Sequence, residues 1–109
     1  MGRLFKVTLN RTEIYACNDC GTHISSKCQI ISKNFHGRGG KAYLMESAVN
    51  VYLGPIEERR LLTGKHEVAD IFCIDCHECI GWKYIAATEE SQQYKVNHYI
   101  LEKTKFQIL

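Results

Sequence analysis

The sequence predicts a small all-β domain. Short segments rich in β-forming residues recur along the chain, and turn residues separate them at close intervals. Two Cys-x-x-Cys pairs, Cys17 with Cys20 and Cys73 with Cys76, are separated by the 52 residues at positions 21–72. Because the pairs are alike in spacing but distant in sequence, we expect them to meet in space and join two halves of the domain.

Length and composition limit the classes of protein that the chain can represent. Its 109 residues suffice for one domain, and its 45% of hydrophobic residues provide a thin core. No apolar run approaches the roughly 18 residues that cross a membrane, and no signal peptide is recognisable. We therefore expect an intracellular protein with no membrane partner, and we expect it to be a monomer. A net charge of +2 is too small to indicate nucleic acid by itself.

The first third of the chain combines short strands with loops. Residues 4–9 alternate weakly, and residues 13–16 form a strand that runs into the first cysteine pair. Residues 21–26 are small and polar, which favours a loop, and residues 29–32 form a short strand. Three glycines within four positions predict a mobile loop over residues 35–40.

The middle of the chain predicts two strands and a turn. Residues 41–45 and 48–53 are rich in β-formers, and Gly54 with Pro55, the only proline, forms a turn after them. The charged residues 57–60 are expected to face solvent. Gly64 then marks another turn.

The last part of the chain predicts further strands and one short helix. Residues 66–72 alternate with period two, and residues 82–86 are again strand-like. Residues 88–95 form the helix, with Thr88 as its N-cap and acidic residues in its first turn. Residues 98–109 return to strand-like alternation.

The four paired cysteines have the chemistry of a structural zinc site. Zinc favours a tetrahedron of four thiolates, and each Cys-x-x-Cys turn supplies two of them. We expect Cys17, Cys20, Cys73 and Cys76 to bind one Zn²⁺, which leaves no open position for a catalytic water. A redox role would require a helix after a pair, and no helical pattern follows either one. Zinc should decide whether the domain folds, because it contributes far more than closing the long loop costs.

Other residues near the cysteine pairs are weaker candidates for metal ligands. His23 and Cys79 each follow a pair by three residues, and His77 follows Cys76 directly. We expect Cys79 to be a free thiol and the two histidines not to bind the metal. Cys28 stands alone in a β-like context, where the prediction is a small buried hydrophobic residue.

The combination of motifs resembles the yippee-like family. The resemblance rests on the cysteine spacing together with Ile31-Ser32-Lys33, Gly40-Lys41-Ala42-Tyr43-Leu44, Asn50-Val51, Glu57-Glu58-Arg59, Leu62-Thr63-Gly64-Lys65-His66, Val68-Ala69-Asp70-Ile71, Gly81-Trp82-Lys83-Tyr84 and Ser91-Gln92-Gln93-Tyr94-Lys95. It covers about residues 15–102, and the opening Met1-Gly2-Arg3-Leu4-Phe5 is similar to plant-type members. It implies one domain over residues 1–109 with a core at about residues 13–104.

The resemblance also implies a fold, a location and a function class. Yippee-like proteins are zinc-binding proteins of the nucleus and cytoplasm with no established enzymatic activity. Their fold is similar to the β-tent, in which two antiparallel sheets meet at an angle and one zinc pins the apex. The cereblon ligand-binding domain, part of a ubiquitin ligase, shares this fold. We therefore expect a non-enzymatic binding or scaffold module with protein partners, including ones related to ubiquitin ligases.

A ligand site near Trp82 is the functional hypothesis that this resemblance favours. Trp82 and Tyr84 match two aromatic positions of the cereblon-like ligand cage, and Leu62, His66 and Asn50 are candidates for the rest of the lining. The simpler alternative is that Trp82 and Tyr84, two apart on one strand, pack in the core.

Two other function classes are weaker. Nucleic-acid binding would use Lys33, His36, Arg38 and Lys41 around the glycine-rich segment, with Arg59 and Arg60, but the neighbouring Glu57 and Glu58 dilute that patch. A methionine sulfoxide reductase would need a reactive thiol with a low pKa, and neither Cys28 nor Cys79 stands in the sequence context that such enzymes use.

Overall fold

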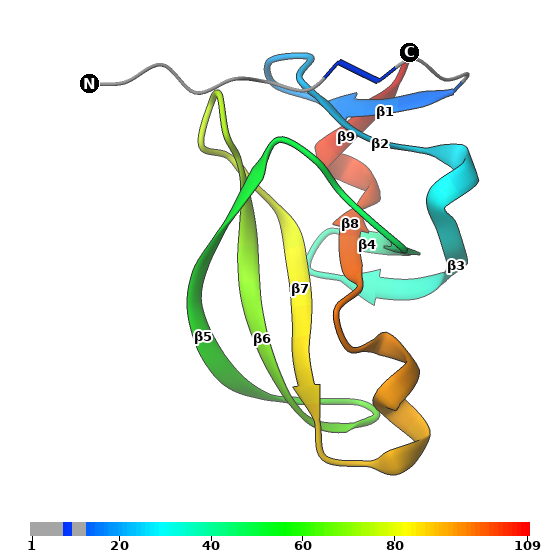
Figure 1. Cartoon of the computed structure of the whole chain (residues 1–109), viewed down its shortest axis with the longest axis vertical. Coiled ribbons are helices and arrows are strands. Elements are labelled where there is room, and N and C mark those ends of the chain that lie inside the picture. The colour runs from blue at the N-terminus through cyan, green and yellow to red at the C-terminus, as the bar shows by residue number, and fades with distance from the viewer. Residues whose placement is uncertain (1–7, 10–12) are drawn as a thin grey trace.

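The chain folds into two antiparallel β-sheets, as the sequence predicts. The computed structural model describes Thr8, Leu9 and residues 13–109. The alternation over residues 4–9 falls mostly outside these residues, and so does the plant-type opening at residues 1–5. One sheet has three strands and the other six, and the two sheets lie at an angle to each other (Figure 1).

The elements follow one another closely along the chain. The strands are β1 (Ile14–Cys17), β2 (His23–Ser26), β3 (Ile30–Gly37), β4 (Gly40–Met45), β5 (Val51–Leu61), β6 (Gly64–Cys73), β7 (Cys79–Ala87), β8 (Tyr99–Glu102) and β9 (Phe106–Ile108). Three short 3-10 helices join them: η1 (Lys27–Gln29), η2 (Glu90–Lys95) and η3 (Lys103–Lys105).

The order of the strands explains how the two sheets are joined. The small sheet has the order β2-β1-β9 and the large sheet the order β3-β4-β8-β7-β6-β5. The chain crosses from the small to the large sheet after β2, and it returns after β8 through η3. Its last strand therefore pairs with its first described strand, with Ala16 opposite Gln107.

Two clusters of buried side chains hold the structure together, one on each face of the large sheet. The first lies against the small sheet and includes Tyr15 and Phe106, whose rings stack at 4.7 Å. The second contains Val68, Tyr84 and Ile100, with Trp82 packed at its edge. Val68 and Tyr84 of this second cluster, together with Trp82, line the pocket described below.

Several turns and loops that the sequence predicts are strands instead. Residues 23–26 form β2, because Ser25 lies opposite Tyr15 of β1 and its buried hydroxyl donates to the carbonyl of Ser47. The glycine-rich segment shortens to a turn at residues 38–39, because β3 continues to Gly37, which lies opposite Gly40 of β4. A paired neighbouring strand outweighs the local turn preference in both places.

The predicted turn at Gly54 and Pro55 is also wrong, because both residues lie inside β5. The pairing of β5 with β6 shifts its register between Leu53 and Ile56, which marks an irregularity at this point. Gly54 and Pro55 have no partner in the register with β6, so the missing N–H of proline interrupts no paired position of this edge strand. Residues 48–50 precede the strand, which begins only at Val51.

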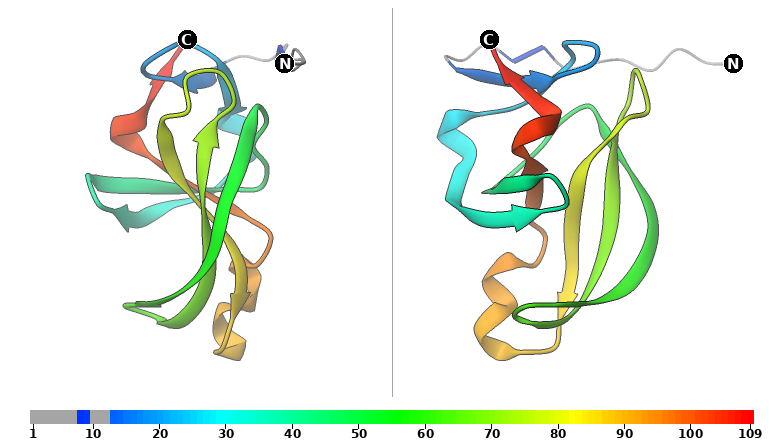
Figure 2. Two further views of the ribbon diagram at one scale, coloured as in Figure 1. Left: turned by 90° about the vertical axis from the view of Figure 1, so that its left-hand side faces the viewer. Right: turned by 180° about the vertical axis from the view of Figure 1, so that it is seen from behind.

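The one predicted helix is present only as a 3-10 helix. It begins at Glu90 with Glu89 as the N-cap residue, not Thr88. The backbone N–H of Thr88 instead donates to the carbonyl of Lys65, which ties it to β6. The helix lies at the end of the molecule opposite the turn that joins β6 to β7 (Figures 1 and 2).

Candidate metal centre and ligand pocket

The four predicted cysteine ligands lie together at the junction of the two sheets. Their sulfur atoms are all within 4.8 Å of one another. Cys17 ends β1 of the small sheet and Cys73 ends β6 of the large one. Each contacts a cysteine of the other pair: Cys17 Sγ lies 3.6 Å from Cys76 Sγ, and Cys20 Sγ lies 3.5 Å from Cys73 Sγ.

These distances fit a zinc ion bound by four thiolates. A tetrahedron with metal–sulfur bonds of about 2.3 Å has sulfur–sulfur edges of roughly 3.8 Å. Cys17 and Cys73 are buried, whereas Cys20 and Cys76 are exposed. Two of the ligands thus lie inside the domain and two at its surface. Because cysteines fill all four positions around the ion, the role of the site is structural.

The two cysteine turns have the same backbone hydrogen bonds. In the first, the N–H of Cys17 donates to the carbonyl of Thr22, and the N–H of Gly21 donates to the carbonyl of Cys17. In the second, the N–H of Cys73 donates to the carbonyl of Glu78, and the N–H of His77 donates to the carbonyl of Cys73. The two turns are therefore structurally equivalent.

Without a metal, the four thiols could not all be ionised. Burial and the neighbouring cysteine thiols raise the pKa of Cys76 to about 12. Burial also tends to raise the pKa of Cys20, but hydrogen bonds from Thr22 and the other thiols outweigh it and lower the pKa to about 7. A divalent cation would supply the positive charge that four clustered thiolates require.

The other candidate ligands lie outside this cluster. Within the described residues, neither His23 nor Cys79 joins the group of sulfur atoms. His23 Nδ1 accepts a hydrogen bond from the backbone N–H of Leu9 at 3.0 Å. Burial raises the pKa of Cys79, which is the opposite of what a reactive thiol needs. Cys28 is exposed, so the prediction that it is a small buried residue is wrong.

His77 has a backbone conformation that Gly21, the equivalent residue of the first turn, adopts easily. Gly21 has φ +78° and His77 has φ +64°, so both are left-handed. We expect His77→Val to destabilise the zinc-bound protein by about 1–2 kcal/mol, because a β-branched residue tolerates this conformation poorly. His77→Asn should cost less, since asparagine adopts it more readily. Thermal unfolding of the two variants compares these costs, and equal melting temperatures would contradict the expectation.

A pocket of about 670 Å³ lies on the other face of the large sheet. Its walls come from β3, the end of β5, β6 at Val68, the middle of β7 at Trp82 and Tyr84, the turn at residues 62–63, and η2. This volume falls within the range of sites that bind small molecules. The pocket and the metal centre therefore use opposite faces of one sheet.

The structure brings three of the five predicted ligand-site residues to this pocket. Trp82, Tyr84 and Leu62 all line it. His66 lies buried behind Tyr84, with ring centroids 5.3 Å apart. Asn50 lies elsewhere: its side chain donates to the carbonyl of His23, and its own carbonyl accepts from the N–H of Ile74. Asn50 thus links β2 to the turn that carries Cys76.

The cationic lining of the pocket includes Arg38 and Arg59, which the sequence indicates as nucleic-acid candidates, and Lys95, which sequence reasoning missed. Lys95 is buried in its wall and Arg38 stands exposed at its rim. Lys95 belongs to the segment predicted as a short helix, and nothing local indicates its burial. The rings of Phe35 and Tyr94 also line the pocket, from β3 and from η2.

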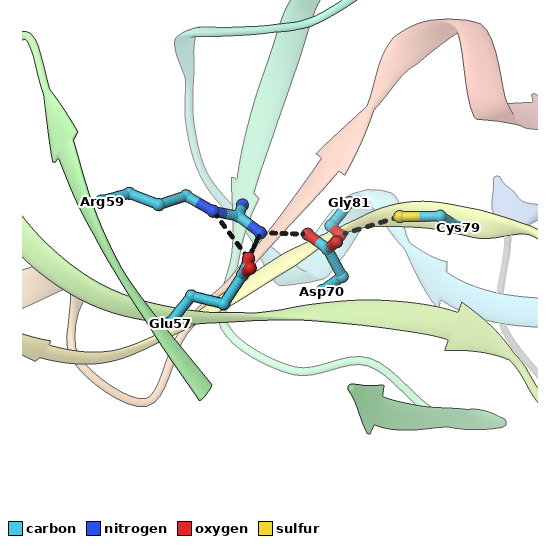
Figure 3. Close-up of polar contacts among 5 residues, drawn as sticks. All are labelled: Glu57, Arg59, Asp70, Cys79 and Gly81. Carbon is cyan, nitrogen blue, oxygen red and sulfur yellow. Dashed lines mark hydrogen bonds and ion pairs between the residues drawn. The ribbon is translucent and has the colours of Figure 1, made fainter. Parts of the chain in front are cut away.

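Arg59 also lines the pocket, but it is engaged by carboxylates. Its guanidinium donates to Glu57 on the same strand and to Asp70 of β6 at 3.0 Å (Figure 3). Burial tends to lower the pKa of Arg59, but the hydrogen bonds and negative charges of these two carboxylates outweigh burial and raise it. The predicted solvated charge cluster over residues 57–60 is therefore partly a fixed ion-pair network across two strands.

Within the described residues, no helix is both long and apolar enough to span a membrane.

Comparison with known proteins identifies clear relatives. Residues 13–109 match the family described as "Yippee zinc-binding/DNA-binding /Mis18, centromere assembly". A yippee-like protein of Solanum tuberosum is 51% identical over 105 residues, covering 96% of this chain and 81% of the relative. Yippee-like 3 of Oryzias latipes is 53% identical over 88 residues, covering 81% of this chain and 74% of the relative.

A solved structure has the same fold. The crystal structure of the Mis18 'Yippee-like' domain matches with a TM-score of 0.70 over 91% of this chain and 96% of that chain. The sequence identity is 18%, so this likeness concerns the fold alone.

Proposed function

The chain belongs to the Yippee/Mis18 family of zinc-binding domains, and we propose that it is a non-enzymatic binding module that receives a protein partner at the pocket beside Trp82. In this proposal the zinc site holds the two sheets together and takes no part in chemistry. The pocket supplies the recognition. The family match itself supports only the domain type and its metal.

The separation of the two sites carries the proposal. All four positions around the zinc are filled by cysteines, so the site offers no place for a substrate. The pocket on the opposite face has aromatic walls and an open side, which are the features of a binding site. Neither remaining cysteine resembles a catalytic thiol, since the pKa of Cys79 is raised and Cys28 does not line the pocket.

The exposed apolar rim of the pocket provides a contact for a protein. Leu62 is fully exposed at the tip of the β5–β6 hairpin, and Tyr94 of η2 is 54% exposed. Both side chains line the pocket. Apolar side chains held out at a pocket rim are typical of interaction surfaces.

A pair of surface variants tests this proposal. Leu62→Ser removes an apolar side chain from the rim, and Leu53→Ser removes one that is 44% exposed on β5 but does not line the pocket. We expect both variants to fold with near-normal melting temperatures. Affinity purification followed by mass spectrometry should recover partners with wild type and Leu53→Ser that Leu62→Ser loses by at least fivefold. Identical partner sets for all three proteins would contradict the proposal.

A further inference from the structure

The pocket is cationic. Lys95, Arg38 and Arg59 contribute positive charges to its walls, whereas no aspartate or glutamate of the described residues lines it. The positive charge of Arg59 is compensated by its ion pairs with Glu57 and Asp70. The charges that remain for a ligand are those of Lys95 and Arg38.

Lys95 is the most unusual of these groups because it is buried. Only 3% of the residue is exposed, and its ammonium donates one hydrogen bond, at 2.9 Å, to Thr63 Oγ1. The rings of Phe35, Tyr84 and Tyr94 surround it, with centroids 5.2, 5.4 and 5.9 Å from Nζ. Among the described residues, no carboxylate lies within ion-pair distance of it.

The hydrogen-bond donors and the charge of this buried ammonium are only partly satisfied by its surroundings. An ammonium group has three donors, and the hydroxyl of Thr63 accepts only one of them. Aromatic faces attract a cation, but they do not replace a counter-ion. Buried charges in proteins are normally paired, so the arrangement calls for an anion from outside the chain.

The second donor of the pocket, Trp82 Nε1, is buried beside the hydroxyl of Tyr84. Burial raises the pKa of Tyr84, and a side-chain hydrogen bond from Trp82 partly offsets that rise. The indole N–H is therefore not left for a ligand. The pocket combines one buried cation that needs an anion with aromatic walls that suit a flat apolar group.

We propose that the pocket binds a carboxylate attached to a flat apolar group, with the carboxylate at Lys95 and the apolar part against Trp82 and Tyr94. This inference rests on the proposed binding role of the pocket and specifies its ligand class. A free aryl carboxylic acid and the C-terminal aromatic residue of a partner peptide have the same chemistry. A methylated-lysine ligand is disfavoured, because the ammonium of Lys95 already occupies the space between the rings.

Paired probes that differ only in charge test the proposal. ¹⁵N-labelled, zinc-loaded protein is titrated with N-acetylphenylalanine and, separately, with its neutral amide. Because the chain has one tryptophan, its indole N–H gives a single NMR signal that reports on the pocket. We expect the acid to shift this signal and those of Tyr94 and Lys95, with a Kd in the millimolar range or below, and the amide to bind at least tenfold more weakly.

Further probes distinguish the source of the carboxylate. Gly-Gly-Phe with a free C-terminus should bind at least as well as N-acetylphenylalanine, and amidation of the peptide should remove its binding. Tighter binding of the peptide indicates a protein terminus, and equal binding indicates that the small acid suffices. A trimethyllysine peptide and a short single-stranded DNA complete the set. Tighter binding of either one than of the acid would overturn the proposal.

Two lysine variants separate the ligand role of Lys95 from a structural one. Lys95→Met keeps the length of the side chain and removes its charge, and Lys27→Met does the same on η1, where Lys27 pairs with Glu13 away from the pocket. We expect Lys95→Met to keep or raise the melting temperature while its affinity for the acid falls at least tenfold. Lys27→Met should bind normally. Unchanged binding by folded Lys95→Met would overturn the proposal.

The acid and amide comparison decides the question on the wild-type protein, even if Lys95→Met fails to fold. If the amide or the trimethyllysine peptide shifts the Trp82 signal and the acid does not, the carboxylate inference is wrong and the pocket keeps its binding role. If no probe shifts the signal, the carboxylate inference is also wrong. The proposed function then depends on the separate partner purification with Leu62→Ser.

Discussion

Removal of zinc by a strong chelator is expected to unfold the domain. A structural zinc bound by four thiolates contributes about 10 kcal/mol or more to folding, and domains of this size have a total stability of about 5–15 kcal/mol. The zinc contribution is therefore of the same size as the whole stability of the domain. Far-ultraviolet circular dichroism and thermal melting, recorded before and after chelation with the zinc content measured, provide the check.

The geometry of the site explains why the loss should be global. The ligands come from the ends of β1 and β6, which belong to different sheets, and their sulfur atoms meet at the junction. Cys17 and Cys73 are also part of the core cluster between the sheets. Without the ion, the four clustered thiols cannot all stay ionised, and the two sheets lose the bond that fixes their angle.

Cysteine variants give a matched control for this experiment. Cys73→Ser removes one buried ligand and should reproduce the effect of chelation. Cys28→Ser and Cys79→Ser change cysteines outside the metal cluster and should retain zinc and fold. A zinc-free protein that keeps its wild-type circular dichroism and melting temperature would show that the sheets hold together without the metal.

The metal centre could be predicted from sequence because its determinants are local. Each Cys-x-x-Cys pair specifies its own turn, and the equality of the two spacings indicates that they share one ion. The equivalence of Gly21 and His77 could have been inferred as well, since each directly follows the second cysteine of its pair. No pattern marks His77 as left-handed on its own, because histidine adopts many conformations.

The pocket could be predicted only in part, because distant segments build it. The alternation of Trp82 and Tyr84 places both on one face of β7, which the sequence indicates. The burial of Lys95 depends on Phe35 of β3 and Thr63 of the β5–β6 turn, which are far from it in sequence. A lysine after a glutamine-rich segment reads locally as a solvated residue, so its burial depends on tertiary packing alone.

Gly81→Ala is expected to destabilise the protein by more than about 4 kcal/mol, although it adds a single methyl group. A Cβ atom at this position would lie 1.8 Å from the carbonyl oxygen and 2.8 Å from the carbonyl carbon of Ile100. Atoms that are not bonded cannot approach so closely, and both of these belong to the backbone of β8. The two strands would have to separate where Gly81 lies opposite Leu101.

The position of Gly81 makes this separation costly on both faces of the large sheet. Its neighbour Ile80 packs in the core beside the metal centre, and Trp82 lines the pocket. Gly54→Ala is the matched control, because the nearest atom to its Cβ is a ring carbon of Phe72 at 2.9 Å, which a side-chain shift can relieve at about 1–3 kcal/mol. Urea unfolding of both zinc-loaded variants measures the difference. If Gly81→Ala costs no more than Gly54→Ala, β7 and β8 are not packed as closely as this contact requires, and the sheet does not couple the metal centre rigidly to the pocket.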